Sequence, residues 1–439
     1  MHWDERKRCI ESSANVVLEE AQTWYRESMA EEYVPRLVDA LVSELVKSAP
    51  AILLTGPRAT GKTTTGSRHV VDIARLDRPG EAAAFRADPD SALAARQTPL
   101  LIDEWQLVPD VLGAIKRAVD DDPRPGRFIV TGSVRADLND ETWAGTGRVI
   151  RVPVWPLTQR EILRRPQGPG LLDQILDAGI DAAVAPSDPP DLLGYLELAQ
   201  AGGLPGAALT SDPVYRRRWQ ASYLEQLVTR DAADIDGGRD PVRLRRYLDI
   251  LAENTAGLPS ESALLDAGGL NARTASNYDR LLKALGILDV VPAWSTNRVK
   301  RLTQRGKRYL TDTGLTAAAL RVDAHDMLRD GPLFGRLLDA LVASQIRAEV
   351  SASDLMPRLH HLRDRDGHEV DLLLDYGRRG QIAIEIKASS APTRSDASHL
   401  IWLQERLPTL RAGIVLHTGQ RIYQLHPQVT AIPIAALWN

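Results

Sequence analysis

Short apolar runs alternate with helix-like periodicity in the first third of the chain. Residues 51–54, 99–102 and 128–130 are continuous apolar runs, which indicate buried strands. A further strand is expected near residues 72–76. Residues 110–120 instead repeat apolar positions at helical spacing, which predicts a helix. Strands that alternate with helices predict a parallel α/β sheet covered by helices on both faces.

Two further stretches, residues 11–48 and the segment from Pro79 to Pro89, have weaker patterns. Residues 11–48 predict helix, because a periodic apolar pattern resumes at Leu37, Leu41 and Leu45. The first part of this stretch, within residues 1–30, is expected to be a packing arm. The segment that contains Pro79, Gly80 and Pro89 is expected to run over the surface.

The rest of the chain predicts three further modules. Residues 166–195 are rich in Pro and Gly, which indicates a boundary or an extended loop, and residues 195–235 predict helices. Residues 240–322 have the order of a winged helix, with helices at 242–254, 259–267 and 272–286 and strands at 288–294 and 307–312. The last module predicts an α/β unit, with helices at 333–348 and 395–407, a hairpin around Asp366-Gly367, and strands at 369–374, 381–388 and 413–416.

Composition excludes several classes of protein. The chain has 439 residues, with 54 basic and 58 acidic side chains and a net charge of −4, so any nucleic-acid surface must be a local patch. Its single cysteine, Cys9, allows no internal disulfide and fits a reducing cytosol. We find neither a secretory signal nor an apolar run of the ~18 residues that a membrane span needs. A cytoplasmic protein with no membrane partner is therefore expected.

The chemistry of the predicted sheet begins at the turn after its first strand. This turn fits the phosphate-binding loop (P-loop), Gly-x-x-x-x-Gly-Lys-Ser/Thr, in which backbone N–H groups and a helix N-terminus converge on an anion. Lys62 would contact the β- and γ-phosphates, and the Thr63 hydroxyl would bind Mg²⁺. The alternative is a glycine-rich turn that fits the pattern by chance. The predicted ATP-binding residues are Gly56, Pro57, Arg58, Ala59, Thr60, Gly61, Lys62, Thr63 and Thr64.

Two carboxylates follow the apolar run at residues 99–102 and would complete an ATPase centre. Asp103 is expected to order the water shell of the Mg²⁺ ion, and Glu104 to act as general base for the attacking water. The alternative is a pair of solvated turn residues. At the end of the next strand, Ser133 or Thr131 could sense the γ-phosphate through a hydroxyl or make a plain strand-end hydrogen bond.

Arg148, in Gly145-Thr146-Gly147-Arg148, is a candidate arginine finger. Such a residue neutralises charge in the transition state and can be supplied by a neighbouring subunit of a homo-oligomer. An arginine that only stabilises a turn is the favoured alternative. The sequence leaves the oligomeric state open.

Six segments together resemble a known family. GPRATGKTT, LLIDEWQ, FIVTGS, GTGRV, PLTQRE and GGLP occur in this order, and from residue 31 to residue 439 the chain resembles bacterial and archaeal AAA+-like ATPases. Members of that family join the ATPase core to a winged helix and to a C-terminal nuclease-like domain. This chain departs from the family at Trp105 and at Ala59-Thr60, and neither departure removes a catalytic group.

The strand pair of the predicted winged helix carries a basic run. This run contains no acidic residue and consists of Arg298, Lys300, Arg301, Arg305, Lys307 and Arg308. With Arg273, Asn277, Arg280 and Lys283 of the preceding helix, it could track the phosphates of DNA. A solvated hairpin, or a winged helix used for subunit contacts, is the alternative.

The last module carries a second chemical signature. Glu385 and Lys387 stand two apart on one predicted strand and share a face. With Asp371, they could hold Mg²⁺ or Mn²⁺ and position a water for cleavage of a phosphodiester. This trio resembles the PD-(D/E)XK nuclease superfamily, in which a preceding helix often supplies a further acid. Asp339 stands at that position, where related chains usually have Glu, and Gln404 is a weaker candidate.

Other interpretations of this module remain open. The trio could be a structural ion pair, Glu385–Lys387 with Asp371, in a fold that has lost its chemistry. The three histidines His360, His361 and His368 are expected at the surface rather than in a zinc site.

The predicted fold class is α/β: a P-loop ATPase parallel sheet, then a winged-helix domain and a PD-(D/E)XK nuclease-like domain. The expected segments are an arm (1–30), an ATPase core (31–165), a helical lid (166–235), a winged helix (236–325) and a nuclease-like domain (326–439). The leading hypothesis is an ATP-hydrolysing protein that acts on DNA and could cleave it. The alternative is a nucleotide-dependent regulatory or scaffolding switch with an inactive C-terminal domain.

Overall fold

The computed structural model describes residues 33–132, 147–231, 240–295, 305–364 and 366–438. The chain divides into two units, Met1–Pro35 and Arg36–Asn439. The predicted arm at residues 1–30 lies outside the described residues. Among the described helices, none combines the length and the apolar composition needed to cross a membrane.

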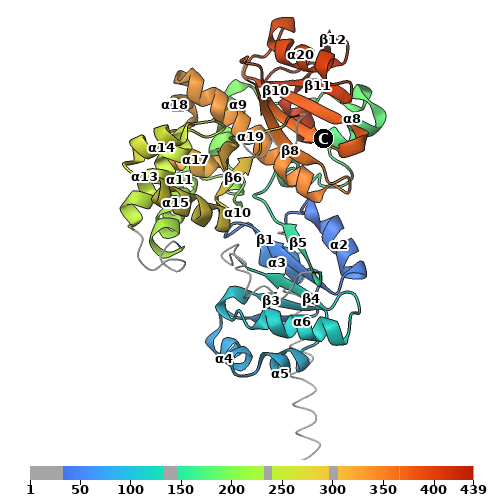
Figure 1. The fold of residues 1–439 in the computed structure, drawn as a ribbon, viewed down its shortest axis with the longest axis vertical. Coiled ribbons are helices and arrows are strands. Elements are labelled where there is room, and N and C mark those ends of the chain that lie inside the picture. Colours follow the sequence, from blue (N-terminus) through green and yellow to red (C-terminus); the bar gives the residue numbers. More distant parts are fainter. Residues whose placement is uncertain (1–32, 133–146, 232–239, 296–304, 365, 439) are drawn as a thin grey trace, which may run out of the picture. The chain divides into compact units, whose positions relative to one another are not determined.

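A five-stranded sheet forms the first part of the second unit (Figure 1). The strand order is β2-β3-β4-β1-β5, and all neighbours are parallel. The strands are β1 (Ala51–Thr55), β2 (Asp72–Arg75), β3 (Leu100–Asp103), β4 (Phe128–Thr131) and β5 (Val149–Pro153). This arrangement confirms the predicted parallel α/β sheet and adds the edge strand β5, which the sequence analysis did not predict.

Alternation along β1 sends its side chains to two separate cores. Ala51 and Leu53 pack in the core formed with α4 (Pro79–Ala87), α5 (Pro89–Ala94) and α6 (Val111–Asp121). Ile52 and Leu54 pack on the opposite face with α2 (Val38–Ser48). Helix α3 (Lys62–Ser67) lies against that second core, where a Cβ on Gly66 would come within 3.0 Å of the Leu101 side chain. The sheet therefore has helices on both faces, and all four carboxyl ends of β1, β3, β4 and β5 lie on one edge.

A mainly helical region follows. Its helices are α7 (Gln159–Ile162), α8 (Leu171–Ala178), α9 (Leu192–Ala201), α10 (Pro205–Ala208), α11 (Pro213–Gln226), α13 (Pro241–Glu253), α14 (Glu261–Gly268) and α15 (Ala272–Ala284). The side chains of Asp240, Ser260 and Asn271 cap α13, α14 and α15 by accepting from backbone N–H groups. An antiparallel pair, β6 (Leu288–Val291) and β7 (Lys307–Leu310), follows α15. The order of three helices and two strands is the predicted one.

The last part of the unit is mostly β. After α17 (Thr313–Leu320) and α18 (Ala324–Arg329), the long helix α19 (Gly331–Ala352) leads into a six-stranded sheet of order β12-β13-β11-β10-β9-β8. The strands are β8 (Arg358–Arg363), β9 (Glu369–Asp375), β10 (Gln381–Lys387), β11 (Leu410–His417), β12 (Tyr423–His426) and β13 (Val429–Pro433). Helix α19 covers one face and α20 (Ser398–Arg406) the other. The hairpin expected around Asp366-Gly367 is formed by β8 and β9. Strands β10 and β11 were also predicted, whereas β12 and β13 were not.

Candidate nucleotide-binding site

The loop between β1 and α3 has a backbone that only glycine tolerates at two positions. Gly56 and Gly61 have φ angles of 150° and 91°, in the region that favours glycine. A Cβ on Gly56 would lie 2.2 Å from the carbonyl oxygen of Val154, so the loop is held directly against the end of β5. The predicted P-loop residues therefore sit between a strand and a helix, as the motif requires.

Lys62 is folded back onto its own loop. Its Nζ donates to the carbonyl oxygens of Gly56 at 3.0 Å and Pro57 at 2.7 Å. Burial lowers the pKa of Lys62 to about 8, although the charges of Glu104 and Asp103 act in the opposite direction. An ammonium group that is poorly solvated in this way gains more from an anionic phosphate than an exposed one does.

Three oxygen-bearing side chains meet at the edge of the sheet. The hydroxyls of Thr63 and Thr131 donate to the same carboxylate oxygen of Asp103, at 2.8 Å and 2.5 Å. Thr63 and Asp103 thus offer the hard oxygen ligands that Mg²⁺ prefers, and they are the residues that would hold it. Thr131 makes the strand-end hydrogen bond that the sequence left as one alternative, and Ser133 lies outside the described residues.

Glu104 follows Asp103 in a left-handed backbone conformation, with φ 57°. Its carboxylate accepts a hydrogen bond from the amide of Gln106, and Trp105 between them is buried. A left-handed conformation costs free energy in a residue other than glycine and is often found at functional sites. Here it turns the Glu104 side chain into the cleft described next.

A cleft of about 670 Å³ opens over the P-loop. Its second wall comes from α10 and α11, which contribute Pro205, Trp219, Ser222, Tyr223 and Gln226. The Trp219 and Tyr223 rings stack with their centroids 5.4 Å apart, and the Tyr223 hydroxyl donates to the Arg58 carbonyl at 3.2 Å. The sequence analysis predicted the P-loop wall but not this aromatic wall, which is distant in the chain.

Arg36 is a site residue that sequence reasoning missed. Its guanidinium donates to the Thr60 carbonyl at 2.7 Å, to the Trp155 carbonyl at 2.6 Å and to the Glu161 carboxylate at 2.9 Å. The side chains of Arg36 and Glu161 are only 5 % and 3 % exposed. Arg36 therefore fixes the P-loop backbone to α7. Its partner Glu161 is the last residue of the PLTQRE segment, which contributed to the family resemblance but was given no role of its own.

Arg148 has a partner within its own chain. Its Nε lies 2.7 Å from a carboxylate oxygen of Asp120 on α6, and both side chains are substantially exposed. The hydrogen bond to Asp120 raises the pKa of Arg148 above its usual value. This ion pair favours the structural interpretation, and the finger role stays a prediction.

Two of the predicted acids of the last module, Asp339 and Asp371, contact a lysine that was predicted to belong to the basic run. Lys307, at the start of β7, donates to Asp339 at 2.5 Å and to Asp371 at 3.0 Å and is almost fully buried. Burial alone would lower the pKa of Lys307, but these two carboxylates hold it well above its usual value. Burial raises the pKa of Asp339 to about 7, whereas Lys307 helps hold that of Asp371 below its usual range.

Glu385 and Lys387 pair with each other on β10. The Lys387 ammonium donates to the Glu385 carboxylate at 3.0 Å, and His399 of α20 lies 3.7 Å from the other oxygen. Burial raises the pKa of Glu385. The expected alternation along this strand holds, since Ile384 and Ile386 pack in or against the core on the opposite face.

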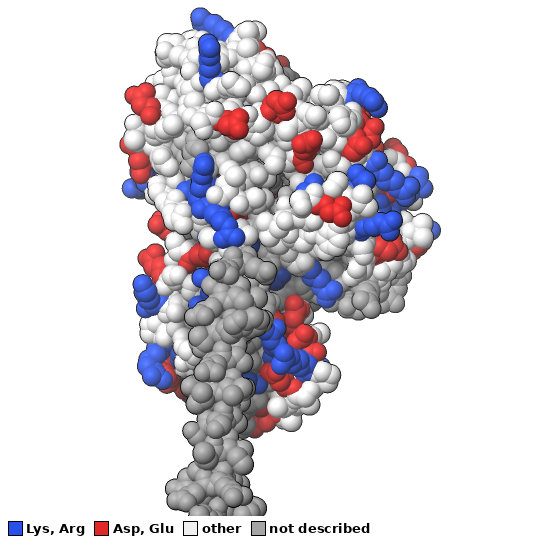
Figure 2. All heavy atoms as spheres, turned by 180° about the vertical axis from the view of Figure 1, so that it is seen from behind, with Lys and Arg blue, Asp and Glu red and all other residues white. Residues whose placement is uncertain are grey.

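The structure divides the predicted basic run at residues 298–308 into three groups. Arg298, Lys300 and Arg301 lie outside the described residues, and Arg305 is exposed. The expectation of an exposed phosphate contact is wrong for Lys307, because that side chain is buried between two carboxylates. Arg308 is half-buried and pairs with Asp279 at 2.7 Å. On the face drawn in Figure 2, basic and acidic side chains of the described residues are interspersed.

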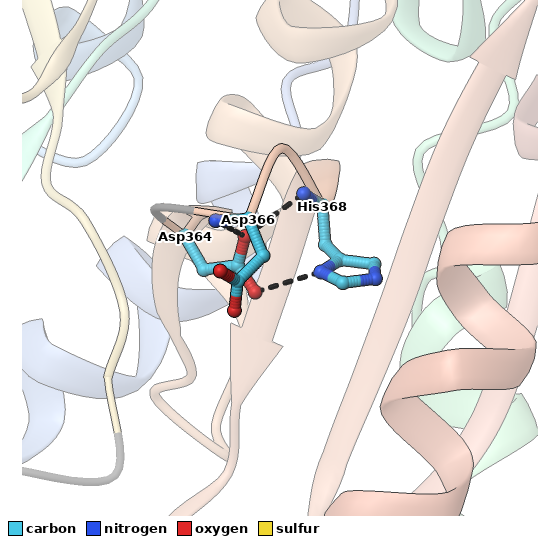
Figure 3. A group of neighbouring side chains, drawn as sticks. All are labelled: Asp364, Asp366 and His368. Atoms are coloured by element: carbon cyan, nitrogen blue, oxygen red, sulfur yellow. Dashed lines mark hydrogen bonds and ion pairs between the residues drawn. The ribbon is translucent and has the colours of Figure 1, made fainter.

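Two of the three predicted surface histidines are buried. His360 and His361 lie within β8, and the His361 imidazole bonds the Arg305 carbonyl at 2.9 Å. Burial lowers the pKa of His361 to about 4. His368 is half-buried, stacks on Trp402, and pairs with Asp364 at 2.8 Å in the turn between β8 and β9 (Figure 3). Backbone N–H groups also donate to Asp364, so this cluster with Asp366 forms a structured turn.

The P-loop, the paired carboxylates and the helix-covered parallel sheet define a P-loop ATPase of the AAA+-like class. Family models agree: residues 48–163 match an AAA domain, residues 193–326 a domain of unknown function (DUF8612) and residues 334–437 another (DUF4143).

Two mycobacterial relatives extend this result over most of the chain. The uncharacterized proteins Rv2008c of Mycobacterium tuberculosis and Mb2031c of Mycobacterium bovis are each 30 % identical over 395 residues, which is 88 % of this chain and 80 % of theirs. The chain belongs to the family of these two proteins.

Solved structures with similar folds include two nucleotide-related proteins. The Walker-type ATPase PABY2304 of Pyrococcus abyssi is 13 % identical, with a TM-score of 0.42, over 66 % of this chain and 97 % of that one. AMPPCP-bound DnaA from Aquifex aeolicus is 12 % identical, with a TM-score of 0.24, over 56 % of this chain and 86 % of that one. These similarities concern the fold alone.

Proposed function

We propose that this protein is an ATP-hydrolysing switch, in which the nucleotide at the P-loop sets the position of the helices that follow the ATPase core. The observation that carries the proposal is the shared cleft, whose walls are the P-loop and α11. A ligand that contacts both walls can favour one arrangement of them over another, which is the requirement for a population shift.

The chemistry proposed for the ATPase centre uses residues of the first sheet. Lys62 would bind the β- and γ-phosphates, while Thr63 and Asp103 would hold Mg²⁺, the ion that neutralises developing charge on the phosphates. Glu104, which lines the cleft beside Lys62, would orient the attacking water and accept its proton.

Backbone contacts connect the cleft to the later modules. The Gly203 carbonyl accepts from the Leu157 N–H at 2.6 Å, and the Gly203 and Leu204 N–H groups donate to the buried Asp312 carboxylate at 2.7 Å and 3.0 Å. Asp312 follows β7 and caps α17. The GGLP segment therefore connects the end of the predicted ATPase core (31–165) to the residue that follows β7. We propose that movement of α10 and α11 is transmitted through these hydrogen bonds to the strand pair β6–β7.

A second candidate function, binding of DNA, is favoured by one observation on α15. Arg273, Arg280 and Lys283 are exposed on this helix, and its one acidic residue, Asp279, is already paired with Arg308 and Tyr247. Exposed cations without a competing exposed acid on the same helix suit a phosphate backbone. Cleavage of DNA is not part of this proposal, because Lys307 occupies the two acids described above.

The switch is tested by hydrogen exchange of the full chain with Mg²⁺ and either ATP, ADP or no nucleotide. We expect ATP to slow exchange in the P-loop and in α11, and Lys62→Ala to abolish both effects. Protection of the P-loop alone, with α11 unchanged, would show that the nucleotide binds without moving the second wall and would refute the switch.

The DNA candidate is tested separately by fluorescence anisotropy with labelled duplex and single-stranded DNA. We expect binding that weakens steeply with salt and that the triple variant Arg273→Ser/Arg280→Ser/Lys283→Ser loses. The matched control is Arg78→Ser/Arg117→Ser/Arg124→Ser, which removes three exposed arginines from the ATPase core. Equal loss in both triple variants would refute a role for α15.

A further inference from the structure

The acidic centre of the last module lies where a divalent cation would be expected from the trio of Asp371, Glu385 and Lys387. In the structure its two nearest acids face an ammonium group that comes from another module. Lys307 belongs to β7, whereas Asp339 lies on α19 and Asp371 on β9. We propose that Lys307 is the resident cation of this centre and takes the place of Mg²⁺ or Mn²⁺ for as long as the strand pair β6–β7 is docked.

Every carboxylate oxygen of the two acids already has a donor. On Asp339, one oxygen accepts from Lys307 and the other from the Tyr309 hydroxyl at 3.0 Å. On Asp371, one oxygen accepts from Lys307 and the other from the Ile386 N–H at 2.9 Å. An ammonium group has three N–H donors and no acceptor. It can therefore donate to both carboxylates at once and occupy the position between them that a small cation would take.

A divalent ion does not fit beside this lysine. Mg²⁺ and Ca²⁺ bind oxygens at roughly 2.0–2.6 Å and require about six to eight ligands. Lys307 Nζ stands 2.5 Å and 3.0 Å from the two oxygens that a bridging ion would need. The third acid, Glu385, pairs with Lys387 through one oxygen, whereas its other oxygen, 3.7 Å from His399, is buried and has no hydrogen-bond partner among the described residues. The residues present therefore satisfy Asp339 and Asp371, but not the whole of Glu385, without a metal.

The lysine arrives on a backbone that is fastened to the last module. Asp289 of β6 makes a bidentate ion pair with Arg347 of α19, at 2.7 Å and 2.6 Å. The Trp294 backbone N–H donates to the His361 carbonyl at 2.6 Å, and the His361 imidazole bonds the Arg305 carbonyl at 2.9 Å. Asp289 lies on β6, and Arg305 lies just before β7, so the position of Lys307 is set by the fold and not by one flexible side chain.

Lys307 can face Asp339 and Asp371 only while the strand pair β6–β7 is docked on the last module. A metal ion at Asp371 would need the same position, so metal binding and docking of this strand pair exclude each other. Asp339, which the sequence marked as a shorter substitute for the usual Glu, is instead the principal partner of Lys307.

The test counts Mn²⁺ bound to the full chain without nucleotide, from the electron paramagnetic resonance signal of free Mn²⁺. Wild type and Asp371→Asn are expected to bind the same number of ions, because Lys307 already occupies the position between the two acids of wild type. A site that is present in wild type and lost in Asp371→Asn would overturn the proposal. Because this comparison needs no nucleotide, it is independent of the proposed switch.

A second variant tests the same claim in the opposite direction. Lys307→Met removes the ammonium and keeps the apolar stem, and we expect it to gain one Mn²⁺ site that Lys307→Met/Asp371→Asn lacks. Lys47→Met, which removes an exposed lysine from α2, should bind as wild type does. A folded Lys307→Met chain that gains no Mn²⁺ overturns the proposal, and if that variant does not fold, the wild-type comparison decides.

Discussion

Removing the guanidinium of Arg36 should loosen the P-loop without replacing any residue that is predicted to bind ATP. The substitution Arg36→Met keeps most of the aliphatic stem and deletes the bonds to Thr60, Trp155 and Glu161. Two backbone carbonyls and one carboxylate then lose a charged donor in a buried place.

The expected cost follows from burial. Deleting one member of a buried ion pair costs about 3–5 kcal/mol, because the other charge remains buried without its partner. Glu161 keeps other donors, namely the Leu37 N–H at 2.8 Å and the Thr158 N–H at 2.7 Å. We therefore expect the lower end of that range, about 3 kcal/mol, and an ATP affinity about tenfold weaker, which corresponds to ~1.4 kcal/mol.

Urea unfolding measures the first quantity and calorimetric titration with Mg-ATP the second. The matched control is Arg117→Met, which removes an arginine from an exposed ion pair with Asp90. Exposed pairs contribute little to stability, so this variant should unfold near the wild-type midpoint. The double variant Arg36→Met/Glu161→Gln should lose less than the sum of the single changes, because the two residues interact directly. Equal midpoints for Arg36→Met and Arg117→Met would refute the reasoning.

Three further outcomes are expected. Glu104→Gln should bind Mg-ATP but not hydrolyse it, as seen by retention of unhydrolysed nucleotide after gel filtration; normal turnover would exclude Glu104 as the base. ATP affinity should fall as pH rises above about 8, because Lys62, with its pKa of about 8, must then take up a proton on binding. Lys62→Arg should remove this pH dependence of ATP affinity. If the pH dependence persists in Lys62→Arg, it belongs to another group. Tyr223→Phe keeps the stack with Trp219 but loses the hydrogen bond to the Arg58 carbonyl. ATP-dependent protection of α11 in hydrogen exchange should therefore weaken by the ~0.5–1.5 kcal/mol typical of one hydrogen bond. Unchanged protection would show that Tyr223 does not couple the P-loop to α11.

The parallel sheet and the P-loop wall of the cleft were predictable because their signals are local. Lys62 and Thr63 are read from one continuous motif, and Asp103 ends an apolar run. Parallel strands place such ends on one edge of the sheet, so the contact between Thr63 and Asp103 at 2.8 Å follows from pattern alone.

Helices α4 and α5 were missed because their prolines were taken as signals for a surface segment. Pro79 and Pro89 are the first residues of these helices. Proline is well suited to the first turn, where its missing N–H would have no partner in the helix. Position within the element, and not the presence of proline, decides its effect.

The role of Lys307 could not be predicted from its neighbours in the sequence. It stands in a basic run, which indicates a solvated face, yet its partners lie 32 and 64 residues further along the chain. Arg36 presents the same difficulty, since Glu161 is 125 residues away. Long-range pairing leaves no periodic or compositional signal in a single sequence. The burial of His360 and His361 in β8 was missed for the same reason, since His361 contacts Arg305, 56 residues away.

Uptake of Mg-ATP by the full chain, measured by calorimetric titration beside Lys62→Ala, tests the central claim most directly. Wild type should bind Mg-ATP at one saturable site per chain, and Lys62→Ala should bind none over the same concentrations. A folded wild-type chain that takes up neither ATP nor ADP, or a Lys62→Ala chain that binds equally well, would contradict it.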